Sequence, residues 1–259
     1  MVSRLPEAME ILKSMRTDIL EASSNSQEGH IPSAYSVLEL IYSIYLGEWN
    51  QNRSVDFDFI LSKGHASLAL YSTLERAKFI ESDWKSNFAE FESDYGGHPD
   101  MNKVNGVSAS TGSLGHGLPM ALGKAFAYRI LNKNKKIYCL VGDGEINEGS
   151  IWESLLIAAH HKIHEMVIIL DFNHSTDRAL AIGELKNKFE AFGFRTFEID
   201  GHDLKQINAV LEYSKESTLT AIIANTIKGY GLGVMENNPA WHHLSPRADE
   251  IDGLKSEIR

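Results

Sequence analysis

The sequence contains very little cysteine: one residue, Cys139, in a chain of 259, so no disulfide can form within it. Cys139 stands in the apolar run "IYCLVG", which predicts a small buried side chain rather than a nucleophile. A reducing, cytoplasmic setting is the simplest expectation for such a chain.

Long apolar runs are also missing, since none approaches the ~18 residues that a membrane-spanning helix needs. Basic residues are too few and too dispersed for a nucleic-acid surface, because 25 Lys and Arg are outnumbered by 35 Asp and Glu. We therefore expect neither a membrane nor a nucleic acid as a partner. The one short basic run, residues 133–136, predicts a solvated loop.

The composition is that of a globular protein with a full core, because hydrophobic residues make up 43% of the chain. Internal repeats, low-complexity segments and linkers rich in Pro, Gly or Ser do not occur. We predict a single domain over residues 1–259.

Short apolar runs alternate with longer segments of helical spacing, as in repeated βαβ units. The predicted strands are residues 57–61, 137–141, 166–170, 196–199 and 219–224. The predicted helices are residues 36–46, 114–131, 151–160, 185–192 and 203–215, the last capped by Asp203. Strands that are apolar throughout predict an α/β fold with a parallel sheet covered by helices on both faces. Residues 229–239 predict a long late loop.

Polar residues follow two of these strands. Asp143 comes after the second strand and Asn173 after the third, and the carboxyl ends of parallel strands meet at one edge. Their oxygen atoms suit a hard cation such as magnesium, calcium or manganese. Gly142 and Gly144 leave room for a phosphate beside Asp143, and Glu148 precedes the start of a helix. On these short motifs alone, however, a capped turn and a strand end are the simpler explanation.

Six motifs in order along nearly the whole chain resemble the transketolase family. They are "EGHIPSAYSVLELIYSIY", "LSKGHASLALYSTL", "GGHPDMNKVNGVSASTGSLGHGLPMALGKA", the stretch from Gly-Asp-Gly to Asp-Phe-Asn, "EAFGFRTFEIDGHD" and "TIKGYGLGVMENNPAWHH". The resemblance implies thiamine diphosphate as cofactor. It also implies magnesium held by Asp143, Asn173 and the backbone carbonyl of Ser175. The implied cofactor-binding residues are His65, Gly112, Leu114, His116, Asp143, Gly144, Glu148, Asn173 and His242.

Four histidines match those that line the active-site channel of the family: His30, His65, His98 and His242. The resemblance implies that they bind sugar hydroxyls and move protons during catalysis. His242 is preferred to His243 because a Trp-His pair is the commoner arrangement in the family.

The family also needs a second, pyrimidine-binding domain, whose glutamate activates the cofactor. This chain ends at Arg259, where the first domain would end, and it resembles the amino-terminal subunit of a split transketolase. We expect a carboxyl-terminal partner subunit in a heterotetramer, and no activity without that partner.

The expected reaction transfers a two-carbon ketol unit from a ketose to an aldose, with sugars or sugar phosphates as substrates. Two departures bear on the substrate: Asp177 and Arg178 replace the family's Asp-Gly segment, and Pro32 stands where relatives have glycine. Two alternatives remain open: a thiamine-dependent carboligase that decarboxylates pyruvate, and a non-catalytic assembly subunit that retains the fold.

Overall fold

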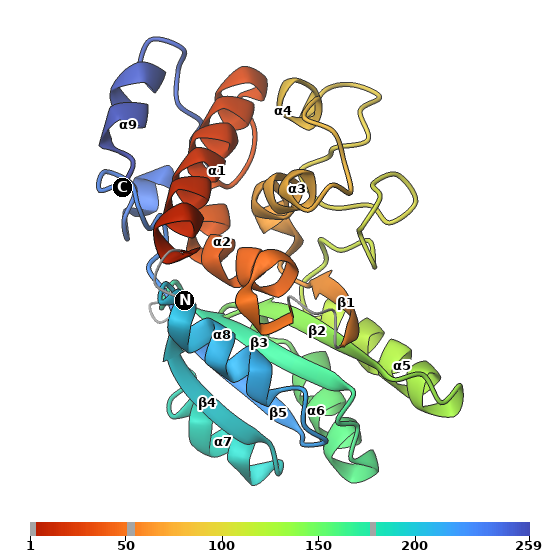
Figure 1. Cartoon of the computed structure of the whole chain (residues 1–259). Coiled ribbons are helices and arrows are strands. Elements are labelled where there is room, and N and C mark those ends of the chain that lie inside the picture. Colours follow the sequence, from red (N-terminus) through yellow and green to blue (C-terminus); the bar gives the residue numbers. More distant parts are fainter. Residues whose placement is uncertain (1–3, 51–54, 177–179) are drawn as a thin grey trace. The chain divides into compact units, whose positions relative to one another are not determined.

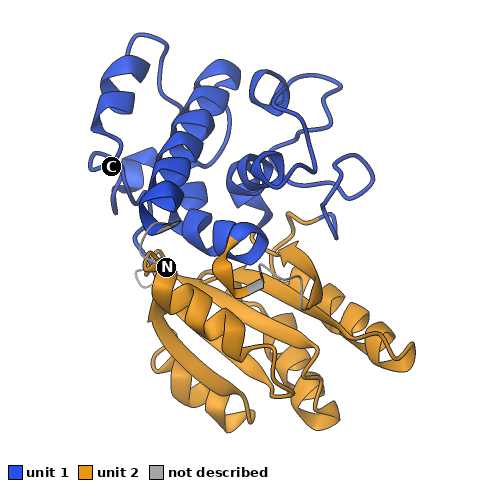
Figure 2. Cartoon of the chain, viewed as in Figure 1, with its two compact units in different colours: residues 1–46, 64–110, 226–259 blue, residues 47–63, 111–225 orange. Residues whose placement is uncertain are grey.

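The computed structural model describes residues 4–50, 55–176 and 180–259 (Figure 1). The departure at Asp177 and Arg178 lies outside the described residues. The chain divides into two compact units (Figure 2). Unit 1 comprises Met1–Leu46, Gly64–Ser110 and Thr226–Arg259, and unit 2 comprises Gly47–Lys63 and Thr111–Asn225. Whether the chain acts as the single domain predicted above stays a prediction.

Unit 2 is built on a five-stranded sheet whose strands are all parallel, in the order β1-β2-β3-β5-β4. The strands are β1 (Asp56–Leu61), β2 (Lys135–Gly142), β3 (Met166–Phe172), β4 (Arg195–Asp200) and β5 (Thr220–Asn225). Each overlaps a predicted strand. Nearly all residues of β2, β3 and β5 are buried, whereas the edge strand β4 alternates between buried and exposed positions. Helices cover both faces of the sheet, which confirms the predicted fold class.

The helices of unit 2 connect the strands. They are α5 (Gly117–Ile130), α6 (Gly149–His161), α7 (Leu185–Ala191) and α8 (Leu204–Tyr213), with 3-10 turns η1 (Glu48–Asn50) and η3 (Glu145–Asn147). Figure 1 shows α8 on the opposite face of the sheet from α6 and α7, as right-handed crossovers require for this strand order. The predicted helix over 114–131 begins only at Gly117, because Gly115 adopts a φ of +81° that breaks the helix before it.

The basic run at 133–136 is not wholly a solvated loop, because β2 begins at Lys135 and Lys136 is buried. The Lys136 ammonium donates hydrogen bonds to the carbonyl oxygens of His164 and Glu216, at 2.7 and 2.8 Å. Burial lowers the pKa of Lys136 to about 8. A lysine stem can pack in an apolar layer when its ammonium reaches carbonyl groups, and sequence alone does not locate those carbonyls.

Unit 1 is helical. Its helices are α1 (Arg4–Ser26), α2 (Ile31–Leu46), α3 (Ser67–Arg76), α4 (Trp84–Asn87) and α9 (Ile251–Glu257), with 3-10 turns η2 (Gly64–Ala66) and η4 (Pro239–Trp241). Helix α2 begins five residues earlier than predicted, because Pro32 lies in the first turn, where a missing N–H costs nothing. The buried Arg16 pairs with Glu39 and donates to the Tyr230 carbonyl, which joins α1 and α2 to the predicted late loop.

Cys139 is fully buried in β2, and burial raises the pKa of its thiol, in agreement with a packing role. Within the ranges that the structure covers, none of the helices combines the length and apolar character needed to cross a membrane.

We expect Asp203→Ala to lower the free energy of unfolding by about 1 kcal/mol, because Asp203 caps α8. Its carboxylate accepts hydrogen bonds from the backbone N–H groups of Lys205 and Gln206, at 2.8 and 3.4 Å. Urea unfolding would measure the change. Asp203→Asn is the control, since asparagine caps equally well. An equal loss of stability in both variants would contradict the capping role.

Candidate functional site

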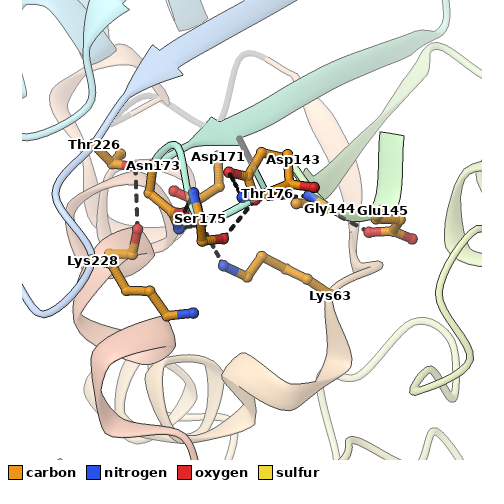
Figure 3. Close-up of polar contacts among 12 residues, drawn as sticks. Lys63, Asp143, Gly144, Glu145, Asp171, Asn173, Ser175, Thr176, Thr226 and Lys228 are labelled. Atoms are coloured by element: carbon orange, nitrogen blue, oxygen red, sulfur yellow. Dashed lines mark hydrogen bonds and ion pairs between the residues drawn. The ribbon is translucent and has the colours of Figure 1, made fainter. Parts of the chain in front are cut away.

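Three adjacent strands of unit 2 each end in a polar residue at the same edge of the sheet. Lys63 follows β1, Asp143 follows β2 and Asn173 follows β3. In the β2–β3 register Gly142 pairs with Asp171, so Asp143 and Asn173 leave the sheet at the same level. Figure 3 shows their side chains close together with those of Asp171 and Ser175.

Asp143 is buried and accepts three hydrogen bonds from nearby loops. Its Oδ1 accepts from the backbone N–H of Gly144 at 2.7 Å and from the hydroxyl of Ser175 at 2.9 Å. Its Oδ2 accepts from the backbone N–H of Thr176 at 3.3 Å. The structure therefore brings the predicted ligands Asp143 and Ser175 into direct contact.

The amide of Asn173 bridges two neighbours. Its Oδ1 accepts from the backbone N–H of Ser175 at 3.1 Å, and its Nδ2 donates to Asp171 Oδ2 at 2.9 Å. Asp171 also forms an ion pair with Lys63, and both residues are almost completely buried. The sequence motifs "DFN" and "SKGH" contain Asp171 and Lys63, but no role was predicted for either. Only the strand pairing reveals that they meet.

Glu145, the residue after the Gly-Asp-Gly motif, was also missed as a site residue. It lies in η3, is almost fully buried, and accepts a hydrogen bond from the Ser62 hydroxyl. It also accepts from the backbone N–H groups of Gly115 and Gly142, at 2.8 and 3.1 Å. Burial raises the pKa of Glu145, and these donors partly offset the rise. Glu145 thus connects the segment after β1, the loop before α5 and the end of β2 through hydrogen bonds.

Residues 111–116, which contain the predicted Gly112, Leu114 and His116, form a loop before α5. Hydrogen bonds from the Thr111 hydroxyl to the Leu61 carbonyl and from the Ser150 hydroxyl to the Gly115 carbonyl, both at 2.6 Å, fix this loop. His116 Nδ1 lies 3.1 Å from the Leu114 carbonyl oxygen.

The predicted Glu148 lies against this loop and is the exposed N-cap residue of α6. A Cβ atom built on Gly115 would lie 2.7 Å from Glu148 Cβ, so only glycine fits there. The glycine therefore sets how closely the 111–116 loop approaches the start of α6.

The residues at this edge fit a magnesium ion bound to a diphosphate. They offer one carboxylate and one amide oxygen, and magnesium prefers oxygen ligands while keeping positions for phosphate and water. No group of three or more His, Cys, Asp or Glu side chains could hold a metal ion anywhere in the described ranges. A cation at Asp143 and Asn173 would therefore take further ligands from other groups. The backbone-carbonyl role of Ser175 stays a prediction, since its hydroxyl and N–H make the contacts seen here.

The four predicted channel histidines lie in unit 1, where they gather around His30. The ring centroid of His30 lies 5.3 Å from that of His65 and 5.7 Å from that of His242. His243 is nearer still, at 4.5 Å. His98 is close enough that a positive charge on its ring would lower the pKa of His30. Hydroxyl groups of α3 hold the loop that carries His98: Tyr71 donates to the His98 carbonyl at 3.3 Å.

The pKa values of three of these rings, His30, His98 and His242, are lowered. Burial lowers the pKa of His30 to about 4, and the charges of His243, His242, His98 and Lys228 contribute to the decrease. Burial also lowers the pKa of His98. The ammonium of Lys228, 3.3 Å from His242 Nδ1, is the largest cause that lowers the pKa of His242. Lys228 was not predicted as a site residue, although it lies in the "TIKGYG" motif.

The preference for His242 over His243 stays a prediction, because both rings lie beside His30. The two differ in their other neighbours. His242 contacts Lys228, whereas His243 Nε2 lies 3.6 Å from a carboxylate oxygen of Glu28.

Comparisons with known proteins identify relatives of this chain. Residues 7–258 match the family described as transketolase, thiamine diphosphate binding domain. The chain is 36% identical to an apulose-4-phosphate transketolase subunit from Actinobacillus succinogenes, over 95% of this chain and 94% of that protein. It is 31% identical to the protein of the same name from Phocaeicola vulgatus, over 94% of this chain and 90% of that protein.

The fold agrees with a solved structure as well. The transketolase from Campylobacter jejuni superimposes with a TM-score of 0.81 and 29% identity, over 96% of this chain. This chain spans 42% of the length of that transketolase.

We expect His30 to stay neutral down to about pH 4, and NMR titration of its ring protons would measure this. Its pKa in the folded state is lower than the ordinary value of 6.5, so the unfolded chain binds the proton more readily. The His30 contribution to stability should therefore fall as the pH drops from about 6.5 to about 4. In His30→Asn this part of the pH dependence should disappear. A His30 ring that titrates near 6.5 would contradict the burial that we describe.

Proposed function

This chain belongs to the transketolase family, and from that premise we propose that it is the amino-terminal subunit of a split, thiamine-diphosphate-dependent transketolase. Such an enzyme would transfer a two-carbon ketol unit from a ketose to an aldose. The observation that carries the proposal is the contact among Asp143, Asn173 and Ser175 at the carboxyl edge of the sheet.

The chain's own residues would hold the cofactor by its diphosphate. Asp143 and Asn173 would bind magnesium, or calcium or manganese in its place, and the backbone at Gly144 leaves room for phosphate oxygens. Thiamine diphosphate, when bound, supplies the carbanion chemistry of the reaction. Gly112, Leu114, His116 and Glu148 are proposed to line the cofactor, as are His65 and His242.

The histidines of unit 1 are proposed to bind the substrate and to transfer protons to and from it. A neutral imidazole can both donate and accept a hydrogen bond, which suits sugar hydroxyls and proton transfer. Burial keeps His30 neutral at physiological pH, with a pKa of about 4. The neighbouring ammonium of Lys228 adds a positive charge to the group, which favours an anionic substrate such as a sugar phosphate.

A companion chain is part of the proposal. The relatives from Actinobacillus and Phocaeicola are each named as one subunit of an apulose-4-phosphate transketolase, which implies a companion subunit in those enzymes. We propose that this chain likewise binds a carboxyl-terminal subunit with the pyrimidine-binding domain, as a heterotetramer. An apulose phosphate is the first substrate to test. The cytoplasmic setting stays a prediction.

Calorimetry with magnesium should show thiamine diphosphate binding to the mixture of this chain and its companion subunit. In Asp143→Ala we expect binding to weaken on the order of 100-fold or more, since even residues behind a metal's ligands affect affinity about 10–100-fold. Asp249→Asn, at an exposed site in unit 1, is the control and should bind normally. A companion complex that forms but binds no cofactor would reject the proposal and favour an assembly role.

We expect His30→Asn to reduce ketol transfer by about 100-fold, the lower range for loss of a proton-transfer group. Cofactor affinity should remain unchanged, because His30 is proposed to act on the substrate. A coupled assay of ketose-to-aldose transfer, together with calorimetry on the same variant, would measure both quantities. Full transfer activity in His30→Asn would remove His30 from the proposed catalytic group.

A further inference from the structure

A buried ion pair, formed by Lys63 and Asp171, lies next to the proposed cation ligands Asp143 and Asn173. Lys63 follows β1 and Asp171 lies near the end of β3, and the two residues are 2% and 0% exposed. Figure 3 shows the Lys63 side chain pointing toward Asp171. Neither residue has a part in the function proposed above, so the pair needs its own explanation.

Asp171 contacts both of the proposed side-chain ligands. Its backbone carbonyl accepts a hydrogen bond from the Asp143 N–H at 3.1 Å, and its Oδ2 accepts from Asn173 Nδ2 at 2.9 Å. One residue therefore fixes the backbone of one ligand and the side chain of the other.

The contact with Asn173 determines which way the amide faces. The oxygen and nitrogen of an asparagine amide are almost equal in size, so shape alone does not select an orientation. Only the oxygen can bind a cation. A carboxylate in an ion pair accepts hydrogen bonds and donates none, so it must face the NH₂ group. The oxygen of Asn173 then points to the side where it meets Ser175.

The ion pair with Lys63 stabilises the buried carboxylate of Asp171. A buried carboxylate without a partner is strongly unfavourable, whereas a paired one is retained. The ammonium of Lys63 also balances the charge of Asp171, so Asp143 alone adds a net negative charge among Lys63, Asp143, Asp171 and Asn173.

We propose that Asp171 is a positioning residue that turns the Asn173 amide oxygen toward the cation position, and that Lys63 holds Asp171 in its role as acceptor. The inference rests on the proposed function for the identity of the cation. Its geometric part concerns this chain alone.

The first test measures the Asn173 side-chain amide by NMR in the chain without added metal. In the unaltered chain, one NH₂ proton should exchange slowly with solvent because it is bonded to Asp171. In Asp171→Asn the new amide can present either its oxygen or its NH₂ group to Asn173, so this protection should be reduced. The double variant Lys63→Met with Asp171→Leu removes the acceptor without leaving a lone buried charge. Protection that survives in the folded double variant would overturn the proposal.

The second test measures Mn²⁺ affinity by electron paramagnetic resonance, with thiamine diphosphate and the companion subunit present. We expect about tenfold weaker Mn²⁺ binding in Asp171→Asn and in the double variant, the lower range for a residue behind a metal ligand. Glu39→Gln is the matched control, because it breaks the similarly buried Arg16–Glu39 pair in unit 1. It should lower the melting temperature but leave Mn²⁺ affinity unchanged.

The two tests separate the inference from the proposed function. If the unaltered complex binds no Mn²⁺, the proposed function fails, while the amide exchange result still decides whether Asp171 orients Asn173. If Mn²⁺ binds equally well to the unaltered chain and to Asp171→Asn, the positioning role fails and the proposed function stands. Equal weakening in Glu39→Gln would also overturn the inference, because the effect would then follow from lost stability.

Discussion

The parallel pairing of β1, β2 and β3 is the constraint on which the proposed cofactor site depends. Parallel strands in adjacent positions end at one edge, so residues far apart in sequence become neighbours there. The register that pairs Gly142 with Asp171 brings Asp143 within hydrogen-bonding distance of Ser175 and Thr176. A slip of one residue would turn the side chains of β3 to the opposite face and separate these groups.

The chemistry of the two units differs in a way that follows from burial and charge. In unit 2 the edge of the sheet carries acids, each with its own set of donors, so it suits a cation. In unit 1 the histidines crowd together near Lys228, and burial together with this crowding lowers the pKa of His30 to about 4. Rings that stay neutral can exchange protons with a sugar without carrying a permanent charge. Each unit thus has an environment suited to one part of the proposed reaction.

The strands and most connecting helices of unit 2 could be predicted from the sequence, because apolar β-branched runs and helical spacing are local signals. The start of α5 could not, since the sequence shows neither the positive φ of Gly115 nor its close approach to Glu148. The start of α2 differs from the prediction for another reason: proline usually interrupts a helix, whereas the first turn of a helix accepts it. Asp143, Asn173 and the four histidines came from motifs. The same motifs contain Lys63, Asp171 and Glu145, but the roles of these residues depend on distant partners. The Ser62–Glu145 contact spans 83 residues of the chain and the Lys63–Asp171 contact spans 108.

Of the three acids at this edge, one is suited to bind a cation. Glu145 has both oxygens occupied by the Ser62 hydroxyl and by backbone N–H groups that hold loops in place. Asp171 has its charge balanced by Lys63. Asp143 accepts hydrogen bonds from one hydroxyl and two loop N–H groups, and within the described residues no cationic side chain pairs with it. A buried carboxylate with neutral donors alone keeps most of its charge uncompensated. Among the three acids, Asp143 is therefore the one that we propose as the cation ligand.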